Sequence, residues 1–143
     1  MSKGLVAEAS ILIDAPKEKV WDALINPEMI KQYLFGTEAT SDWTEGSSIT
    51  YKGQWQDTSY EDKGVVVKVI ENELLETTYW SSMSGTEDNE ENYANVKYQI
   101  SEEEGKTKLT ITQDNNKDEE TKNHSEKNWN MVLDSLKKLL ETS

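Results

Sequence analysis

Residues 125–140 read SEKNWNMVLDSLKKLL, and this stretch decides the fold. Its large apolar residues recur every three or four positions, which is the spacing of one face of an α-helix, at Trp129, Leu133, Leu136 and Leu140. Charged and amide side chains fall between them and would occupy the opposite face. The stretch therefore predicts an amphipathic helix whose apolar face needs a core supplied by the residues before it.

The start of the chain predicts one strand followed by two short helices. Residues 5–13 alternate apolar side chains in the way a half-buried strand does. Pro16 follows, and because proline suits the first turn of a helix, we expect a helix over residues 16–25. Asn26-Pro27 also places a proline in the first turn of a helix, and it predicts a second short helix with Asn26 as the N-cap.

Between residues 41 and 113 apolar side chains recur at every second residue, and this spacing predicts consecutive strands. Glu104-Gly105 supplies a turn between two of them and predicts a hairpin. We expect a loop over residues 81–92 and a polar connection over residues 114–120. The expected strands cover residues 49–55, 60–70, 74–79, 96–100 and 109–111.

The order of these elements predicts an α+β fold in one domain, residues 1–143. An antiparallel sheet with one apolar face and a single long amphipathic helix has a simple packing solution, in which the sheet curves around the helix. We therefore expect a curved antiparallel sheet wrapped around the C-terminal helix, with two short helices after the first strand.

Four motifs resemble the START-like (SRPBCC, helix-grip) superfamily. APKEKVWDAL at residues 15–24 is similar to its opening motif, and GVVVKVI at residues 64–70 is similar to its central strand. Residues 105–112 and 128–136 resemble the ending of the branch related to the C-terminal domain of the Hsp90 ATPase activator Aha1. The resemblance implies a sheet that grips the last helix around an internal cavity. In different members that cavity binds lipids, sterols, polyketides or plant hormones, and occasionally it catalyses cyclisation.

The charge composition argues against several classes of partner. The chain has 28 acidic residues against 15 basic ones, giving a net charge of -13, and every basic residue is lysine. Arginine usually supplies bidentate contacts to phosphate, and an acidic surface repels polyanions and anionic membranes, so we expect neither nucleic acid nor membrane insertion. The acidic surface is compatible with a basic protein partner, such as a chaperone.

The absence of cysteine excludes disulfides, thiolate zinc sites and thiol nucleophiles. It is compatible with a reducing cytoplasm, and the N-terminal residues lead into strand-like sequence without a signal peptide. We expect a cytoplasmic protein that is a monomer.

The inward-facing aromatic residues are the candidate ligand site. Large aromatic side chains most often fill a core. The resemblance favours an alternative, in which they wall a cavity whose few hydroxyl groups orient a ligand with an apolar body and one polar group. We expect the cavity to be lined by Tyr51, Trp55, Tyr79, Tyr98, Trp129, Leu133 and Leu136.

The sequence predicts no catalytic residue, metal site or cofactor. His124 is the only histidine and lies in polar sequence without an orienting partner. Residues 114–118 mimic the start of a calcium loop, but Glu119 replaces the glycine required at its sixth position and Ser125 the glutamate required at its twelfth.

Three hypotheses for the function stay open. The leading one is a non-enzymatic protein that binds a small hydrophobic or amphipathic molecule. The second is a chaperone-associated interaction module of the Hsp90-activator type. The third is a cyclase or hydrolase that uses cavity carboxylates, for which Glu38 and Asp42 are the first candidates.

Overall fold

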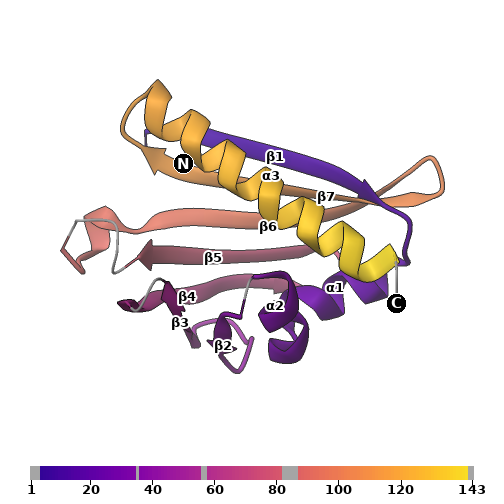
Figure 1. Cartoon of the computed structure of the whole chain (residues 1–143), viewed down its shortest axis with the longest axis horizontal. Coiled ribbons are helices and arrows are strands. Elements are labelled where there is room, and N and C mark those ends of the chain that lie inside the picture. The colour runs from indigo at the N-terminus through magenta and orange to yellow at the C-terminus, as the bar shows by residue number, and fades with distance from the viewer. Residues whose placement is uncertain (1–3, 35, 56–57, 82–86, 142–143) are drawn as a thin grey trace.

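The structure, a computed structural model, describes residues 4–34, 36–55, 58–81 and 87–141, without the side chains of residues 54, 55, 58 and 90. Its described part has the predicted α+β architecture, with a curved antiparallel sheet and a long C-terminal helix lying across it (Figure 1).

The sheet has seven strands in the order β1-β7-β6-β5-β4-β3-β2. Every neighbouring pair is antiparallel, and the first strand of the chain pairs with the last. The hairpin at Glu104-Gly105 is confirmed, since it joins the sixth strand to the seventh. The strands are β1 (Leu5–Ile13), β2 (Glu38–Thr40), β3 (Ser48–Trp55), β4 (Thr58–Ile70), β5 (Leu74–Ser81), β6 (Ala94–Glu103) and β7 (Lys106–Asn116).

The two short helices, α1 (Lys17–Ile25) and α2 (Pro27–Tyr33), follow β1 as predicted. Pro16 stands immediately before α1 in an extended conformation, so that helix begins one residue later than expected. At α2 the Asn26 side chain accepts a hydrogen bond of 3.1 Å from the backbone N–H of Glu28. The N-cap role predicted for Asn26 is therefore confirmed. A short 3₁₀ helix, Glu90–Asn92, lies in the segment predicted as a loop.

The polar connection predicted over residues 114–120 is shorter than expected, because β7 continues to Asn116 and α3 (Glu119–Glu141) begins six residues before the predicted start at Ser125. Only Lys117 and Asp118 lie between them. Asp114 and Asn116 are polar but buried, and hydrogen bonds satisfy them. The Asp114 carboxylate accepts from the backbone N–H of Asn95 at 2.6 Å, and the Asn116 amide donates to the carbonyl of Leu5 at 3.0 Å. Inward-facing polar residues interrupt the hydrophobic pattern without ending the strand.

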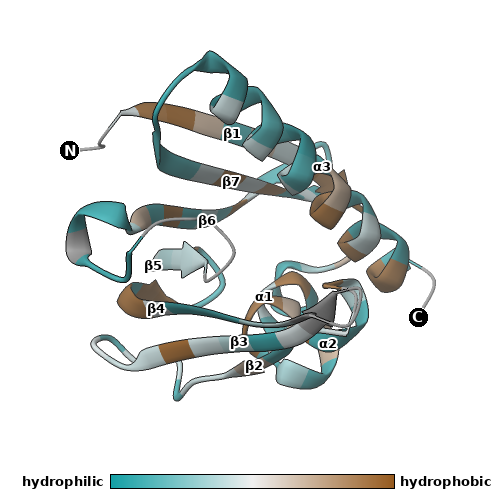
Figure 2. Cartoon of the chain, turned by 60° about the vertical axis from the view of Figure 1, so that its left-hand side comes forward, coloured by the Kyte–Doolittle hydropathy of each residue, from teal (hydrophilic) through white to brown (hydrophobic). Residues whose placement is uncertain are grey.

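The helix α3 buries the face that the sequence predicts. Leu133, Leu136 and Leu140 are buried, Trp129 is half-buried and Met131 is exposed. Figure 2 shows apolar residues concentrated in the C-terminal half of α3, where the helix approaches α1 and α2, and a polar N-terminal half. The helix therefore packs most of its apolar surface at one end of the sheet.

Side chains of α3 also hold the outer side of β1. The backbone N–H of Glu8 donates to the Glu126 carboxylate at 3.0 Å, and that of Asp14 donates to the Glu141 carboxylate at 2.8 Å. Between them, the Lys137 ammonium donates to the carbonyl of Leu12 at 3.1 Å. These bonds hold the pKa values of both carboxyl groups below their usual 4.5. For Glu126 the main cause is the hydrogen bond from the backbone N–H of Glu8. For Glu141 the main cause is the hydrogen bond from Lys137, followed by the one from the backbone N–H of Asp14.

Acid is expected to weaken this attachment. The folded chain binds protons at Glu126 and Glu141 less readily than the unfolded chain, so the stabilisation is complete above pH 4.5 and is lost as pH falls through the lowered pKa values. The variant carrying Glu126→Gln and Glu141→Gln should be less stable than wild type at neutral pH and should lose less stability on acidification.

Urea unfolding followed by tryptophan fluorescence, between neutral pH and about pH 3, measures both effects. Glu103→Gln, at an exposed position near the β6–β7 turn, is the matched control and should follow wild type. Parallel pH profiles for wild type and the double variant would contradict the prediction.

Candidate ligand cavity

A cavity of about 440 Å³ lies between the inner face of the sheet, α2 and α3. Side chains from β3 to β7 form one wall, and Leu24 of α1 together with residues of α2 and α3 form the other. Most of the lining is aliphatic or aromatic. Asn128 of α3 lines the cavity and is also exposed to solvent, so the cavity reaches the surface beside this helix.

The structure brings most of the predicted site residues to this wall. The lining residues among them are Tyr51, Tyr79, Tyr98, Trp129 and Leu136. Leu133 is instead fully buried in the core, because the lining positions on α3 form one stripe and Leu133 lies beside it. Trp55 belongs to β3, but its side chain lies outside the described part of the structure. That these residues bind a ligand stays a prediction.

The aromatic lining is arranged edge to face. The rings of Tyr51 and Tyr79 have centroids 6.4 Å apart, and those of Tyr98 and Trp129 are 6.0 Å apart at 88°. The Trp129 indole N–H donates to the Gln113 side chain at 2.7 Å, which fixes the indole on the wall. These contacts join α3 to β7 and β6 and hold the wall in one arrangement.

The cavity tyrosines are neutral hydrogen-bonding groups. Burial raises the pKa values of Tyr33, Tyr51, Tyr79 and Tyr98 well above the ordinary 10.0. The negative charge of Asp62 raises the pKa values of Tyr51 and Tyr79 further. All these phenols therefore stay protonated at neutral pH.

Asp62 is the functional candidate that the sequence analysis misses. It lies on β4, opposite Tyr51 of β3 and Ser81 of β5, and its side chain lines the cavity while being only 9% exposed. The Tyr79 hydroxyl donates to its Oδ2 atom at 2.7 Å. Its Oδ1 atom is buried and has no hydrogen-bond partner among the described residues.

An orphaned acceptor of this kind costs about 1–3 kcal/mol or more when it belongs to a charged group, so folds rarely keep one without a reason. The signal for it exists in the sequence. Asp62, Gly64 and Val66 share one face of the predicted strand, and all are buried. Because a charged residue is normally exposed, Asp62 is easily assigned to the solvent-facing side of the strand.

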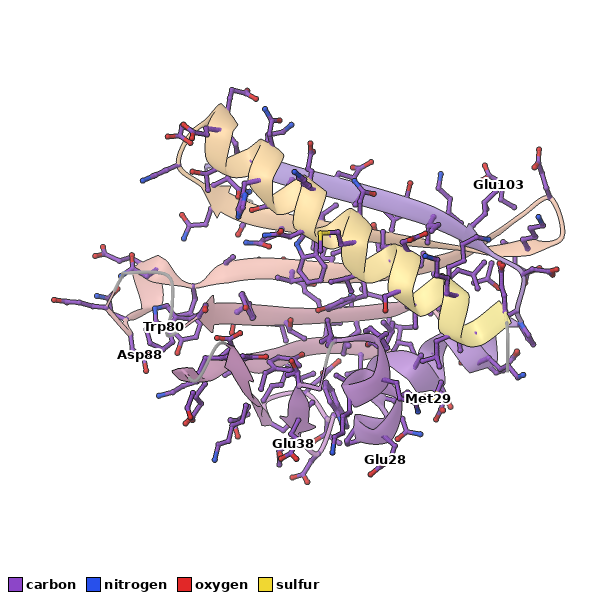
Figure 3. All side chains as sticks on the ribbon, in the orientation of Figure 1. Glu28, Met29, Glu38, Trp80, Asp88 and Glu103 are labelled. Atoms are coloured by element: carbon purple, nitrogen blue, oxygen red, sulfur yellow. The ribbon has the colours of Figure 1, made fainter. Side chains whose placement is uncertain are left out.

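The two carboxylates first suspected of catalysis lie elsewhere. Glu38 and Asp42 are exposed, and neither is among the described residues that line the cavity. Glu38 lies at the β2 side of the molecule, away from α3 (Figure 3), and pairs with Lys31 at 3.8 Å. Catalysis by either group therefore loses its structural basis.

The described ranges, residues 4–34, 36–55, 58–81 and 87–141, offer neither a metal site nor a membrane-spanning helix. There, no group of three or more His, Cys, Asp or Glu side chains could hold a metal ion. His124 lies on α3 with its side chain exposed. None of the helices in the same ranges has the length and apolar character needed to cross a bilayer.

The curved sheet, the long C-terminal helix and the cavity between them define the class, an Aha1-type, START-like helix-grip domain. Residues 14–141 match the family of activator of Hsp90 ATPase homolog 1-like proteins, and the chain belongs to this family. The family resemblance drawn from the four sequence motifs is thereby confirmed. No curated protein is similar enough to count as a match.

Solved structures share this fold. Protein ChR145 from Cytophaga hutchinsonii is 44% identical, with a TM-score of 0.85, and the match covers 99% of this chain and 97% of that one. The Aha1 dimer from Colwellia psychrerythraea is 21% identical over 96% of each chain, with a TM-score of 0.75. DynU16, from the dynemicin biosynthetic locus, is 17% identical over 96% of this chain and 47% of that one, with a TM-score of 0.80.

Proposed function

We propose that this protein binds a small amphipathic molecule in the cavity, without catalysing a reaction. The apolar body of the ligand lies against the aromatic and aliphatic wall, and a hydrogen-bond donor on the ligand contacts Asp62. The observation that carries the proposal is that Asp62, whose buried Oδ1 atom has no hydrogen-bond partner among the described residues, lines an otherwise largely apolar cavity.

The size and lining of the cavity support this function. Its volume of about 440 Å³ falls within the range of about 300–1,000 Å³ that is usual for small-molecule sites. Such sites combine an apolar wall with a few polar groups that fix the orientation of the ligand. Asp62 and the tyrosine hydroxyls supply those polar groups here.

Val132→Trp is expected to abolish ligand binding by filling the cavity. Val132 lines the cavity from α3, whereas the adjacent Met131 is 54% exposed. Met131→Trp therefore adds the same side chain to the same helix on the solvent side. Nile red, a neutral dye that fluoresces in apolar surroundings, should bind wild type and Met131→Trp saturably, and Val132→Trp at least tenfold more weakly.

Fluorescence titration gives the affinities, and circular dichroism checks that both variants fold. Saturable binding that Val132→Trp leaves unchanged would place the dye outside the cavity and contradict the proposal. If wild type does not bind the dye, the cavity does not act as a site for small apolar molecules.

Docking to a chaperone is a second candidate function, favoured by the family and by the net charge of -13. Contact through surface charge weakens steeply with ionic strength, whereas burial of an apolar ligand does not. Binding to a purified Hsp90-type chaperone that disappears in high salt, and that Val132→Trp leaves intact, would assign docking to the surface.

A further inference from the structure

Resting on the binding function proposed above, we infer that the ligand carries a protonated amine, which Asp62 Oδ1 binds, and that the cavity rejects amphiphiles ending in a carboxylate. The structural feature behind this inference is the buried carboxylate of Asp62, whose Oδ1 atom has no hydrogen-bond partner among the described residues. The described residues that line the cavity include no cationic partner for it.

The described cavity lining contains a single carboxyl group and no basic residue. Among the described lining residues none is a lysine, arginine or histidine, and Asp62 is the single acid. The phenols stay neutral, because burial and the charge of Asp62 both raise the pKa values of Tyr51 and Tyr79. The described wall therefore contains a carboxyl group without a cationic partner, and a cationic ligand would supply one.

The two carboxylate oxygens of Asp62 differ in their hydrogen bonding. The Tyr79 hydroxyl occupies Oδ2 at 2.7 Å and so fixes the rotation of the carboxylate. Oδ1 is then the remaining acceptor. Tyr51 stands opposite Asp62 across the β3–β4 ladder and also lines the cavity, and its hydroxyl group is hydrogen-bonded to that of Tyr98.

The carboxylate also explains what the cavity should exclude. A second negative charge beside Asp62 would be desolvated and repelled, so a fatty acid of suitable length should bind poorly. An alcohol can donate to Oδ1 but leaves the charge uncompensated. The amine, the alcohol and the acid of one chain length thus separate charge recognition from hydrogen bonding and from apolar burial.

The test is displacement of Nile red by decylamine, decanol and decanoate at neutral pH, below the concentrations at which they aggregate. About 1 M salt shortens the screening length to about 3 Å and so suppresses attraction of the amine to the acidic surface. A charge-assisted hydrogen bond predicts that decylamine displaces the dye from wild type at about tenfold lower concentration than decanol, with decanoate weakest.

Two variants locate the effect. Asp62→Asn keeps the shape of the side chain and should remove the preference for the amine, whereas Asp42→Asn removes an exposed charge and should retain it. Tyr79→Phe takes away the donor to Oδ2 but leaves the carboxylate, so decylamine should still bind more tightly than decanol. This variant keeps the test decisive even if Asp62→Asn does not fold.

The outcomes distinguish the two proposals. Dye binding with equal displacement by amine and alcohol would overturn the inference and leave the binding function standing. An amine preference that survives in folded Asp62→Asn, or one that vanishes in folded Tyr79→Phe, would also overturn it. Failure of wild type to bind the dye would overturn both.

Discussion

Gly64→Ala is expected to destabilise the fold severely. A Cβ atom at this position would lie 1.9 Å from the carbonyl oxygen of Thr78 and 2.8 Å from its carbonyl carbon. Both atoms are backbone of the paired strand, so no side-chain rotation relieves the contact, and β4 and β5 would have to separate. Overpacking costs about 1–3 kcal/mol where side chains can adjust, so we expect a loss of about 3 kcal/mol or more.

The matched control is Gly53→Ala in the neighbouring strand β3. There the new Cβ would meet the Tyr60 ring, with its hydroxyl oxygen at 2.5 Å, and that side chain can move. Tyr60 lines the cavity and its hydroxyl shares a hydrogen bond of 2.7 Å with Thr37, so Gly53→Ala should change dye binding more than stability. Urea unfolding compares the two variants, and equal stability would contradict the close approach at Gly64.

Leu133→Ala is expected to lower the free energy of unfolding by about 2–5 kcal/mol while leaving the affinity for Nile red nearly unchanged. The Leu133 side chain is fully buried where α3 packs on the core, and it lies off the cavity wall. Truncation therefore leaves a void in the core without removing a wall contact.

Leu136→Ala, one turn further along α3, is the matched comparison. Leu136 is also buried but lines the cavity, so its truncation should weaken dye binding as well as stability. Urea unfolding and dye titration on the two variants give the four values needed. A larger change in dye affinity for Leu133→Ala than for Leu136→Ala would contradict the assigned wall.

The elements that the sequence predicted well are those with local signals. Asn26-Pro27 starts α2 through a cap made within three residues, and the alternation in β6 and β7 depends only on the strand period. The end of β7 could not be predicted in this way. Asn116 can be buried because its side-chain Nδ2 donates to the backbone carbonyl of Leu5 and its side-chain Oδ1 accepts from the Ser125 hydroxyl. Such partners come together only in the folded chain.

The candidate site likewise contains residues that a local pattern predicts and residues whose positions depend on the folded chain. The aromatic wall could be anticipated, because Tyr51, Tyr79 and Tyr98 lie on apolar strand faces. The position of Leu133 depends on how α3 crosses the sheet, which no local pattern specifies. Asp62 was missed because a lone charged residue is nearly always exposed, although it shares an inward strand face with Gly64 and Val66. Its hydrogen bond from Tyr79 forms only in the folded chain.

The carboxylates of α3 that hold β1 also limit how this protein can associate. An exposed edge strand offers unpaired backbone groups that a peptide or a second sheet can extend. Here α3 holds both ends of that edge through Glu8 and Asp14, and at the opposite edge β2 spans only Glu38–Thr40. An incoming strand would have to displace α3 to pair with β1, and β2 would offer it only three residues. The side chains of α3 therefore oppose intermolecular sheet growth at the β1 edge.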